Sequence, residues 1–238
     1  ALDIATLTGG NAALTTAGDV RYGLALDEPP AGWRVGNAAA AKGISARLLA
    51  GETVALVHDC GDIGWLCDSG APFDTHAAPG DTGAVRVTEK ALVDVGDQLI
   101  LHPPVLALGL GCERNCAPEE LIELVDRTLN DAGLSPHAVA CVATIDVKMD
   151  EPAIHAVAAY LDVPVRFYSA IELEAQAPRL ANPSDVVFAE VGCHGVAEGA
   201  ALAVVGGAGE LRVEKQRSKR ATCAIGFAAA GIDAKTVG

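Results

Sequence analysis

The chain has 238 residues, half of them apolar and few of them aromatic, and its formal charge at pH 7 is −14. This length is enough to bury a substantial core in one large or two modest domains. The negative charge argues against nucleic acid or an anionic membrane as the main partner. No apolar stretch is long enough to span a bilayer, and no basic-then-apolar leader opens the chain. We therefore expect a cytoplasmic protein.

The cysteines and the first residue add two expectations about context. The seven cysteines are odd in number and lack the spacing of a disulfide framework, so we expect reduced cytosolic thiols. The chain begins at Ala1, and its single methionine is Met149. We therefore expect a processed or trimmed chain, or a piece of a longer polypeptide.

The first hundred residues predict a small α/β domain. Short β-branched and aliphatic runs between Gly/Asp-rich turns are typical of strands, and an alanine-rich run that stops at Gly51 predicts a helix. The stretch His102-Pro103-Pro104 cannot continue a hydrogen-bonded strand, so we place a boundary there, with domains at 1–103 and 104–238. The expected elements are strands 53–58, 83–89 and 97–102 and helix 38–50.

The second half alternates apolar strands with longer helices. The segment 118–133 has an apolar stripe, Pro118 in its first turn and Gly133 at its end, which predicts a complete amphipathic helix. This alternation predicts an α/β fold, with a three-layer C-terminal domain whose parallel or mixed sheet carries helices on both faces. The other expected elements are strands 105–111, 139–145, 163–169, 210–214 and 221–227, and helices beginning near 151 and 196.

Ligands bind open α/β sheets at the carboxyl ends of their strands, and the loop GCERNC (111–116) lies at one such end. A strand, a glycine-bearing turn and a helix N-terminus expose backbone N–H groups to an anion. Arg114 replaces the third glycine of a dinucleotide fingerprint, and no Gly-Lys-Ser/Thr follows. Arg114 could bind a carboxylate through both guanidinium nitrogens, and a solvated surface arginine is the equal alternative.

Cys112 and Cys116 lie in the same loop without a second matching pair, so we expect no metal site and no cofactor. Small, semi-buried turn residues explain them best. A zinc site completed by Cys193 and His194 is the alternative.

Two further stretches carry acid–base groups. In TIDVKMDEP (144–152), Asp146 and Lys148 lie two apart in an expected extended segment, so they would share a face as an acid–base or orienting pair. An ordinary ion pair is the alternative, and Asp150 is expected to cap the next helix. His194 lies between glycines one helical turn before Glu198, so the two could reach each other and carry a proton. A structural histidine is the alternative.

Two features mark the remaining loops. Ser169 and Glu172 form a capping-box pattern at the start of a short helix. The basic run KQRSKR (215–220) is typical of a solvated hairpin, but it could also attract a polycarboxylate.

Five stretches in order resemble one family. GLGCERNCAPEEL, ATIDVKMDEP, FYSAIEL, VGCHGVAEGAAL and KRATCAIGF are similar to the C-terminal domain of the cobalamin-biosynthesis family CbiG, called CobE where that domain stands alone. The resemblance covers roughly residues 105–228, and its specificity lies in the order of several segments. Upstream, ALTTAGDVRYGLALDE resembles the segment that ends the family's N-terminal domain and enters its middle domain. The whole chain thus looks like the middle and C-terminal parts of a CbiG-type protein.

The resemblance implies corrin chemistry, namely hydrolysis of cobalt-precorrin-5A with opening of the ring-A δ-lactone and release of acetaldehyde. The implied partners are an anionic corrin intermediate, other enzymes of the pathway or a fused precorrin methyltransferase domain. We expect Asp146, Lys148, His194 and Glu198 to be catalytic. The residues expected to bind substrate are Gly109, Gly111, Cys112, Arg114, Glu151 and Ser169.

One departure from the family pattern leaves the function open. The glycine-rich G-H-x-G-G-A-N stretch of the family's N-terminal domain has no match here, and TGGNAALTTAGD (8–19) holds only a partial GGN. A non-catalytic module that binds a corrin intermediate is therefore the alternative to a hydrolase. An unrelated small-molecule α/β enzyme is a third possibility.

Overall fold

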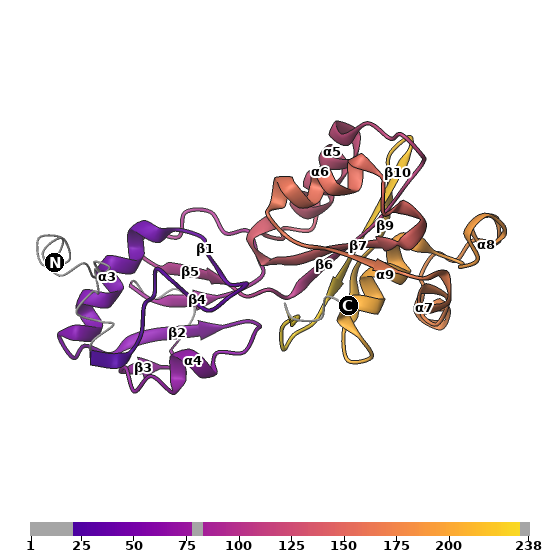
Figure 1. Ribbon diagram of the computed structural model, residues 1–238. Helices are drawn as coiled ribbons and strands as arrows, with labels where there is room; N and C mark the ends of the chain where they lie inside the picture. The colour runs from indigo at the N-terminus through magenta and orange to yellow at the C-terminus, as the bar shows by residue number, and fades with distance from the viewer. Residues whose placement is uncertain (1–20, 78–82, 234–238) are drawn as a thin grey trace, which may run out of the picture.

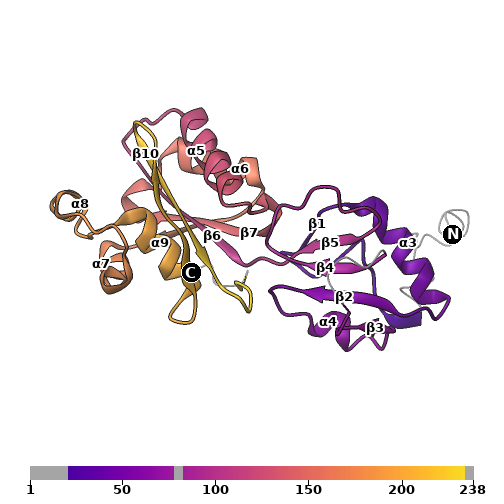
Figure 2. The same cartoon turned by 180° about the vertical axis from the view of Figure 1, so that it is seen from behind.

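The computed structural model describes residues 21–77 and 83–233, so the partial GGN at 8–19 lies outside the described residues. The described chain forms two lobes, each built around its own five-stranded sheet (Figures 1 and 2). The confirmed fold class is therefore α/β.

The N-terminal sheet has the order β1-β5-β4-β2-β3, in which β2 to β5 are parallel and β1 runs antiparallel to β5. The three predicted strands are confirmed as β2, β4 and β5. Turn residues on both sides of each apolar run limit its length. The helix α3 ends where Gly51 adopts φ +81°, as its sequence predicts. The elements are β1 (Arg34–Val35), α3 (Ala38–Leu49), β2 (Val54–His58), α4 (Gly64–Cys67), β3 (Phe73–Asp74), β4 (Val85–Val87) and β5 (Leu99–His102).

The C-terminal sheet has the order β8-β7-β6-β10-β9 and is mixed. Its strands β6 to β8 are parallel, and β10 and β9 run antiparallel to their neighbours. The helices α5 and α6 cover one face and α9 covers the other, which gives three layers (Figure 1). The elements are β6 (Leu106–Cys112), α5 (Pro118–Asp131), η1 (Pro136–Ala138), β7 (Val139–Ile145), η2 (Asp146–Lys148), α6 (Pro152–Leu161), β8 (Val165–Tyr168), α7 (Ala170–Glu174), η3 (Ala177–Arg179), α8 (Asp185–Val191), α9 (Val196–Val205), β9 (Glu210–Arg217) and β10 (Ala221–Phe227).

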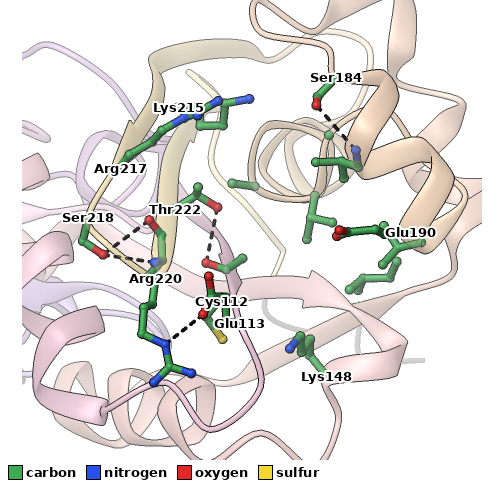
Figure 3. Close-up of a pocket in the computed structure, with 18 of the residues that line it drawn as sticks. Cys112, Glu113, Lys148, Ser184, Glu190, Lys215, Arg217, Ser218, Arg220 and Thr222 are labelled. Carbon is green, nitrogen blue, oxygen red and sulfur yellow. Dashed lines mark hydrogen bonds and ion pairs between the residues drawn. The ribbon is translucent and has the colours of Figure 1, made fainter.

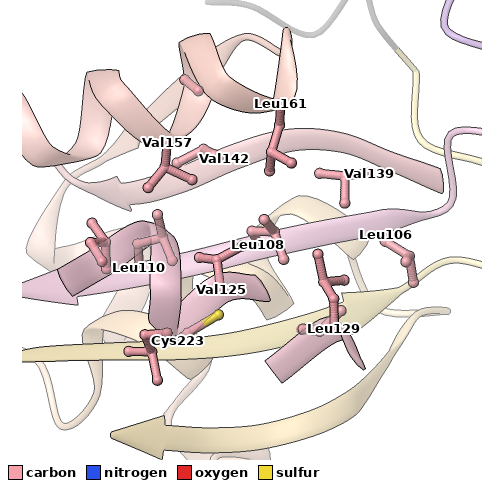
Figure 4. Close-up of a cluster of buried hydrophobic side chains, with 14 of the residues drawn as sticks. Leu106, Leu108, Leu110, Val125, Leu129, Val139, Val142, Val157, Leu161 and Cys223 are labelled. Carbon is pink, nitrogen blue, oxygen red and sulfur yellow. The ribbon is translucent and has the colours of Figure 1, made fainter. Parts of the chain in front are cut away.

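The main core lies between this sheet and the helices α5 and α6 (Figure 4). Leu106, Leu108 and Leu110 alternate along β6 toward these helices and are fully buried. Each such side chain contributes about 1.5–3 kcal/mol by leaving water. This burial fixes the register of the central strand β6, and it thereby fixes where the loop after β6 begins.

The opposite face of β6 contacts α9 at backbone distance. A Cβ on Gly109 would lie 1.9 Å from the Ala197 carbonyl oxygen and 2.7 Å from the Ala201 nitrogen. Only glycine allows this approach, because any side chain would collide with helix backbone. Gly109 was expected to bind substrate, and the structure instead places it in the packing of the helix on the sheet.

Buried polar groups join the two lobes. The Nδ1 atom of His102 lies 2.7 Å from the Thr88 carbonyl oxygen, and its Nε2 atom lies 3.2 Å from the Ser135 hydroxyl. The Ser135 amide donates to the Glu89 carbonyl, 2.8 Å away. Because Pro103 follows His102 directly, we propose the domain boundary at residues 103–104.

Within the described part of the chain, no single helix is long and apolar enough to cross a bilayer. The helices α8 and α9 reach that length and composition only as a pair, bent by 80° at the break between them.

Candidate functional site

A cleft of about 740 Å³ opens at the carboxyl ends of β6 and β7 (Figure 3). The β9–β10 hairpin forms one wall, and α8 with the start of α9 forms the other. The cleft therefore lies at the carboxyl ends of strands, where the sequence predicts a ligand site. Its lining residues are Gly111, Cys112, Glu113, Arg114, Ile145, Lys148, Ser184, Val186, Val187, Glu190, Val191, Gly195, Val196, Ala197, Lys215, Arg217, Ser218, Lys219, Arg220, Ala221 and Thr222.

The cleft is cationic although the whole chain carries −14. Among the described residues, six basic and two acidic side chains line it. Glu113 is one of the two acids, and it is paired with Arg220 at 2.9 Å. The side chains of Arg217 and Lys219 have no ion-pair partner within the described ranges, so both are available to an anion. A concentration of unpaired positive charge in a concave site attracts anionic ligands.

Arg220 shapes the loop after β6. Its guanidinium donates to the carbonyl oxygens of Asn115 and Arg114, at 3.1 and 2.8 Å, as well as to Glu113. These bonds hold Asn115 at φ +55°, in the left-handed region. In the sequence, Arg220 lies in the basic run 215–220 and in the family-like stretch KRATCAIGF, but neither pattern predicts its contacts with the loop after β6. Part of that run is the end of β9, and its side chains form a cleft wall.

Arg114 lines the cleft, but it also makes contacts of its own. Its guanidinium lies 2.5 Å from both the Asp150 carboxylate and the Val147 carbonyl oxygen, and its side chain is 54% exposed. The expectation that Asp150 caps α6 is wrong, because Asp150 pairs with Arg114 and Glu151 occupies the N-cap position. Binding of a carboxylate by Arg114 would compete with Asp150.

The predicted pairing of Asp146 with Lys148 on an extended segment is wrong. These residues form a 3-10 turn, in which side chains two positions apart point in different directions. Lys148 enters the cleft, and its ammonium lies 3.7 Å from Glu151, while Asp146 does not line the cleft. Glu151 is 1% exposed, and its Oε1 atom has no hydrogen-bond partner among the described residues. Glu151 therefore lies behind Lys148 and not on the cleft surface.

Cys112 lines the cleft beside Lys148, as Figure 3 shows. Burial raises the pKa of its thiol to about 11, although the Lys148 charge acts in the opposite direction. The side chain is therefore a neutral thiol at pH 7 and not an activated nucleophile.

We expect alkylation of Cys112 by iodoacetamide to be slow at pH 7.5 and to accelerate up to about pH 11, because only the thiolate reacts. Peptide mass spectrometry over a pH series measures the rate, with the exposed Cys67 as the internal reference. A rate that levels off near pH 8 would contradict the buried thiol.

The predicted contact between His194 and Glu198 is wrong. His194 precedes the N-cap Gly195 and therefore lies outside α9, whereas Glu198 lies within that helix. The His194 ring contacts Glu174, at 2.9 Å from Nδ1, and Asp185, at 3.6 Å from Nε2. Neither His194 nor Glu198 lines the cleft.

Glu198 is a buried anchor behind the cleft, with 1% of its surface exposed. Its carboxylate accepts hydrogen bonds from the amides of Ala181, Asn182 and Lys215 and from the Asn182 side chain, at 2.8–2.9 Å. Burial alone would raise the pKa of Glu198, but these bonds outweigh it and leave the pKa below its ordinary value. Glu198 therefore joins the segment before α8 to strand β9, the two walls of the cleft.

The Ser169 side chain is used locally. It forms the predicted capping box with Glu172 at the start of α7 and does not line the cleft. The described residues contain no group of three His, Cys, Asp or Glu side chains that could hold a metal ion. Of the ten predicted site residues, the cleft brings together four, namely Gly111, Cys112, Arg114 and Lys148.

Comparisons with known proteins match both halves of the chain. The family model "Cobalamin synthesis G C-terminus" matches residues 106–226, and "Cobalamin biosynthesis central region" matches residues 29–103. Protein CobE of Sinorhizobium sp is 53% identical over 120 residues, which are 50% of this chain and 78% of that protein.

Two further matches are a more distant sequence relative and a solved structure. A cobalt-precorrin-5A hydrolase of Priestia megaterium is 27% identical over 241 residues, covering 94% of this chain and 63% of the hydrolase. This chain thus spans less than two thirds of the hydrolase's length. A solved crystal structure of CobE, a protein from the cobalamin biosynthetic pathway, is 40% identical in sequence to this chain. The match covers 52% of this chain and 92% of the CobE chain, with a TM-score of 0.49.

Proposed function

Because this chain belongs to the CbiG/CobE family of cobalamin biosynthesis, we propose that its cleft binds the anionic corrin intermediate that a cobalt-precorrin-5A hydrolase acts on. The observation that carries the proposal is the set of basic side chains in a cleft of an otherwise acidic chain. The carboxylates at the rim of a corrin would pair with Arg217, Lys219 and Lys215. Guanidinium and ammonium groups are the ordinary protein partners of carboxylates.

We propose a limited role in hydrolysis for the residues of this cleft. Lys148 is the one predicted catalytic residue that lines it, and an ammonium there could stabilise the oxyanion formed when water attacks a lactone. The Cys112 thiol is neutral at pH 7, and His194 and Glu198 are engaged behind the walls. These engagements also favour the second candidate function, a binding or accessory module without turnover. Other pathway enzymes and a fused methyltransferase domain remain proposed partners.

One experiment separates the two candidates. The purified chain is mixed with cobalt-precorrin-5A, its absorbance reports binding, and coupled reduction reports acetaldehyde. Binding with acetaldehyde release supports the hydrolase, and binding without release supports the accessory module. A chain that neither binds the substrate nor releases acetaldehyde would contradict the corrin-binding proposal.

Arg217→Glu should weaken binding of cobalt-precorrin-5A about tenfold or more, since it replaces an unpaired cation in the cleft with an anion. The wild-type affinity should also fall as salt is added, because exposed charges are screened. A titration at two ionic strengths measures both effects. Lys42→Glu makes the same charge change on the exposed side of α3, in the other lobe, and should leave the affinity within about twofold. Equal losses in the two variants would place the ligand elsewhere.

A further inference from the structure

The helix α8 has two different sides. Val186, Val187, Glu190 and Val191 line the cleft, and their spacing places them along one side of the helix. Phe188 faces away and stacks on the His194 ring, with centroids 4.4 Å apart and an interplanar angle of 26°. The wall opposite the basic hairpin is therefore mostly apolar, and its polar side chains are Ser184, whose hydroxyl caps the start of α8, and Glu190 (Figure 3).

Glu190 is unexpected in a cleft that attracts anions. Figure 3 shows its carboxylate pointing into the cavity, and it has no hydrogen-bond or ion-pair partner among the described residues. Glu113, the other acidic lining residue, is already paired with Arg220. At 4 Å two like charges repel by about 1 kcal/mol in water, and by more in a site that excludes water. A ligand that is anionic throughout would be repelled by this wall.

We infer that α8 covers one face of a metallated ring and that Glu190 faces the ring's metal cation. This inference rests on the proposed function and names the ligand more closely. A ring polycarboxylate with a bound metal is negative at its rim, apolar on its faces and positive at its centre. The rim meets the cations of the β9–β10 hairpin, the face packs on Val187 and Val191, and the centre lies opposite Glu190.

Two residues outside the cleft position this wall. Glu174 accepts hydrogen bonds from both the backbone amide and the Nδ1 atom of His194, each at 2.9 Å. His194 in turn contacts Phe188 and Asp185 on the far side of α8. His194, predicted as catalytic, is therefore a positioning residue that fastens α8 beside the cleft.

The test uses Glu190→Gln and two probes that share a polycarboxylate ring, metal-free uroporphyrin and its cobalt(III) complex. Glu190→Gln should bind the cobalt complex about tenfold more weakly, because it loses an attraction to the metal. The same variant should bind metal-free uroporphyrin as tightly as the wild type or more tightly, because a like charge has been removed. Titration of the porphyrin absorbance band measures both affinities. Glu123→Gln removes the same charge from the exposed side of α5 and should change neither affinity.

The outcomes separate this inference from the proposed function. If Glu190→Gln changes both affinities equally, or neither, the contact with the metal is wrong. The corrin cleft would still be supported in that case, provided that Arg217→Glu weakens binding of both rings. If the wild-type chain binds neither ring, the inference about α8 and Glu190 is overturned, whereas the proposed function is decided by the titration with cobalt-precorrin-5A.

Discussion

Gly109→Ala should lower the free energy of unfolding by about 3 kcal/mol, the upper end of the usual cost of overpacking, because the atoms it meets belong to helix backbone. The new methyl group would meet the backbone of Ala197 and Ala201, with contacts between 1.9 and 2.9 Å. Relief requires α9 to move off β6, which separates two layers of the C-terminal lobe. Urea unfolding followed by circular dichroism measures the change.

The matched control is Gly207→Ala. Gly207 lies in the turn after α9, and a Cβ there would meet nothing within 4 Å. We expect this variant to keep the wild-type stability within about 0.5 kcal/mol. If Gly109→Ala were as stable as Gly207→Ala, the close approach of α9 to the sheet would be wrong.

Glu198→Gln should lower the free energy of unfolding at pH 7 by about 3 kcal/mol. Each carboxylate oxygen accepts two hydrogen bonds, and an amide would turn one of these oxygens into a donor facing two other donors. The loss should also weaken ligand binding, because Lys215 and the segment before α8 lose their common anchor. Thermal and urea unfolding measure the stability, and the titration described above measures the binding.

The pH dependence of stability gives a second test of Glu198. Its pKa is lower in the folded chain than the unfolded value of about 4.3, so its stabilisation is complete above that value and is lost as pH falls through the folded pKa. The wild type should therefore lose more stability than Glu198→Gln between pH 5 and the acid limit of folding. Exposed Glu123→Gln should keep the wild-type profile. Parallel profiles for wild type and Glu198→Gln would show that the buried carboxylate is not charged.

The sequence predicts the elements well where local chemistry determines them. The helix α5 begins at Pro118 and is followed by Gly133 at φ +64°, because proline and glycine suit those two positions. The strand β6 is an unbroken apolar run because both of its faces are covered. Such signals lie within a few residues of the feature that they predict.

The site was predicted less completely because it depends on side chains from distant segments. Arg220 holds a loop about a hundred residues earlier in the chain, and Glu198 anchors segments on both sides of itself. The spacing of four residues predicted that Glu198 meets His194, but Gly195 is the N-cap of α9, so His194 lies before the helix and the helical spacing does not apply. Glu190 carried no signal, since an exposed glutamate on a short helix becomes notable only when cations line the opposite wall.

The most direct test of the cleft is a crystal structure of this chain with cobalt-precorrin-5A, with the metal located by its anomalous scattering. We expect a single cobalt peak in the cleft between the β9–β10 hairpin and α8, with the ring carboxylates at Arg217 and Lys219. A cobalt peak outside that cleft, in crystals where the cleft is open to solvent, would contradict the account.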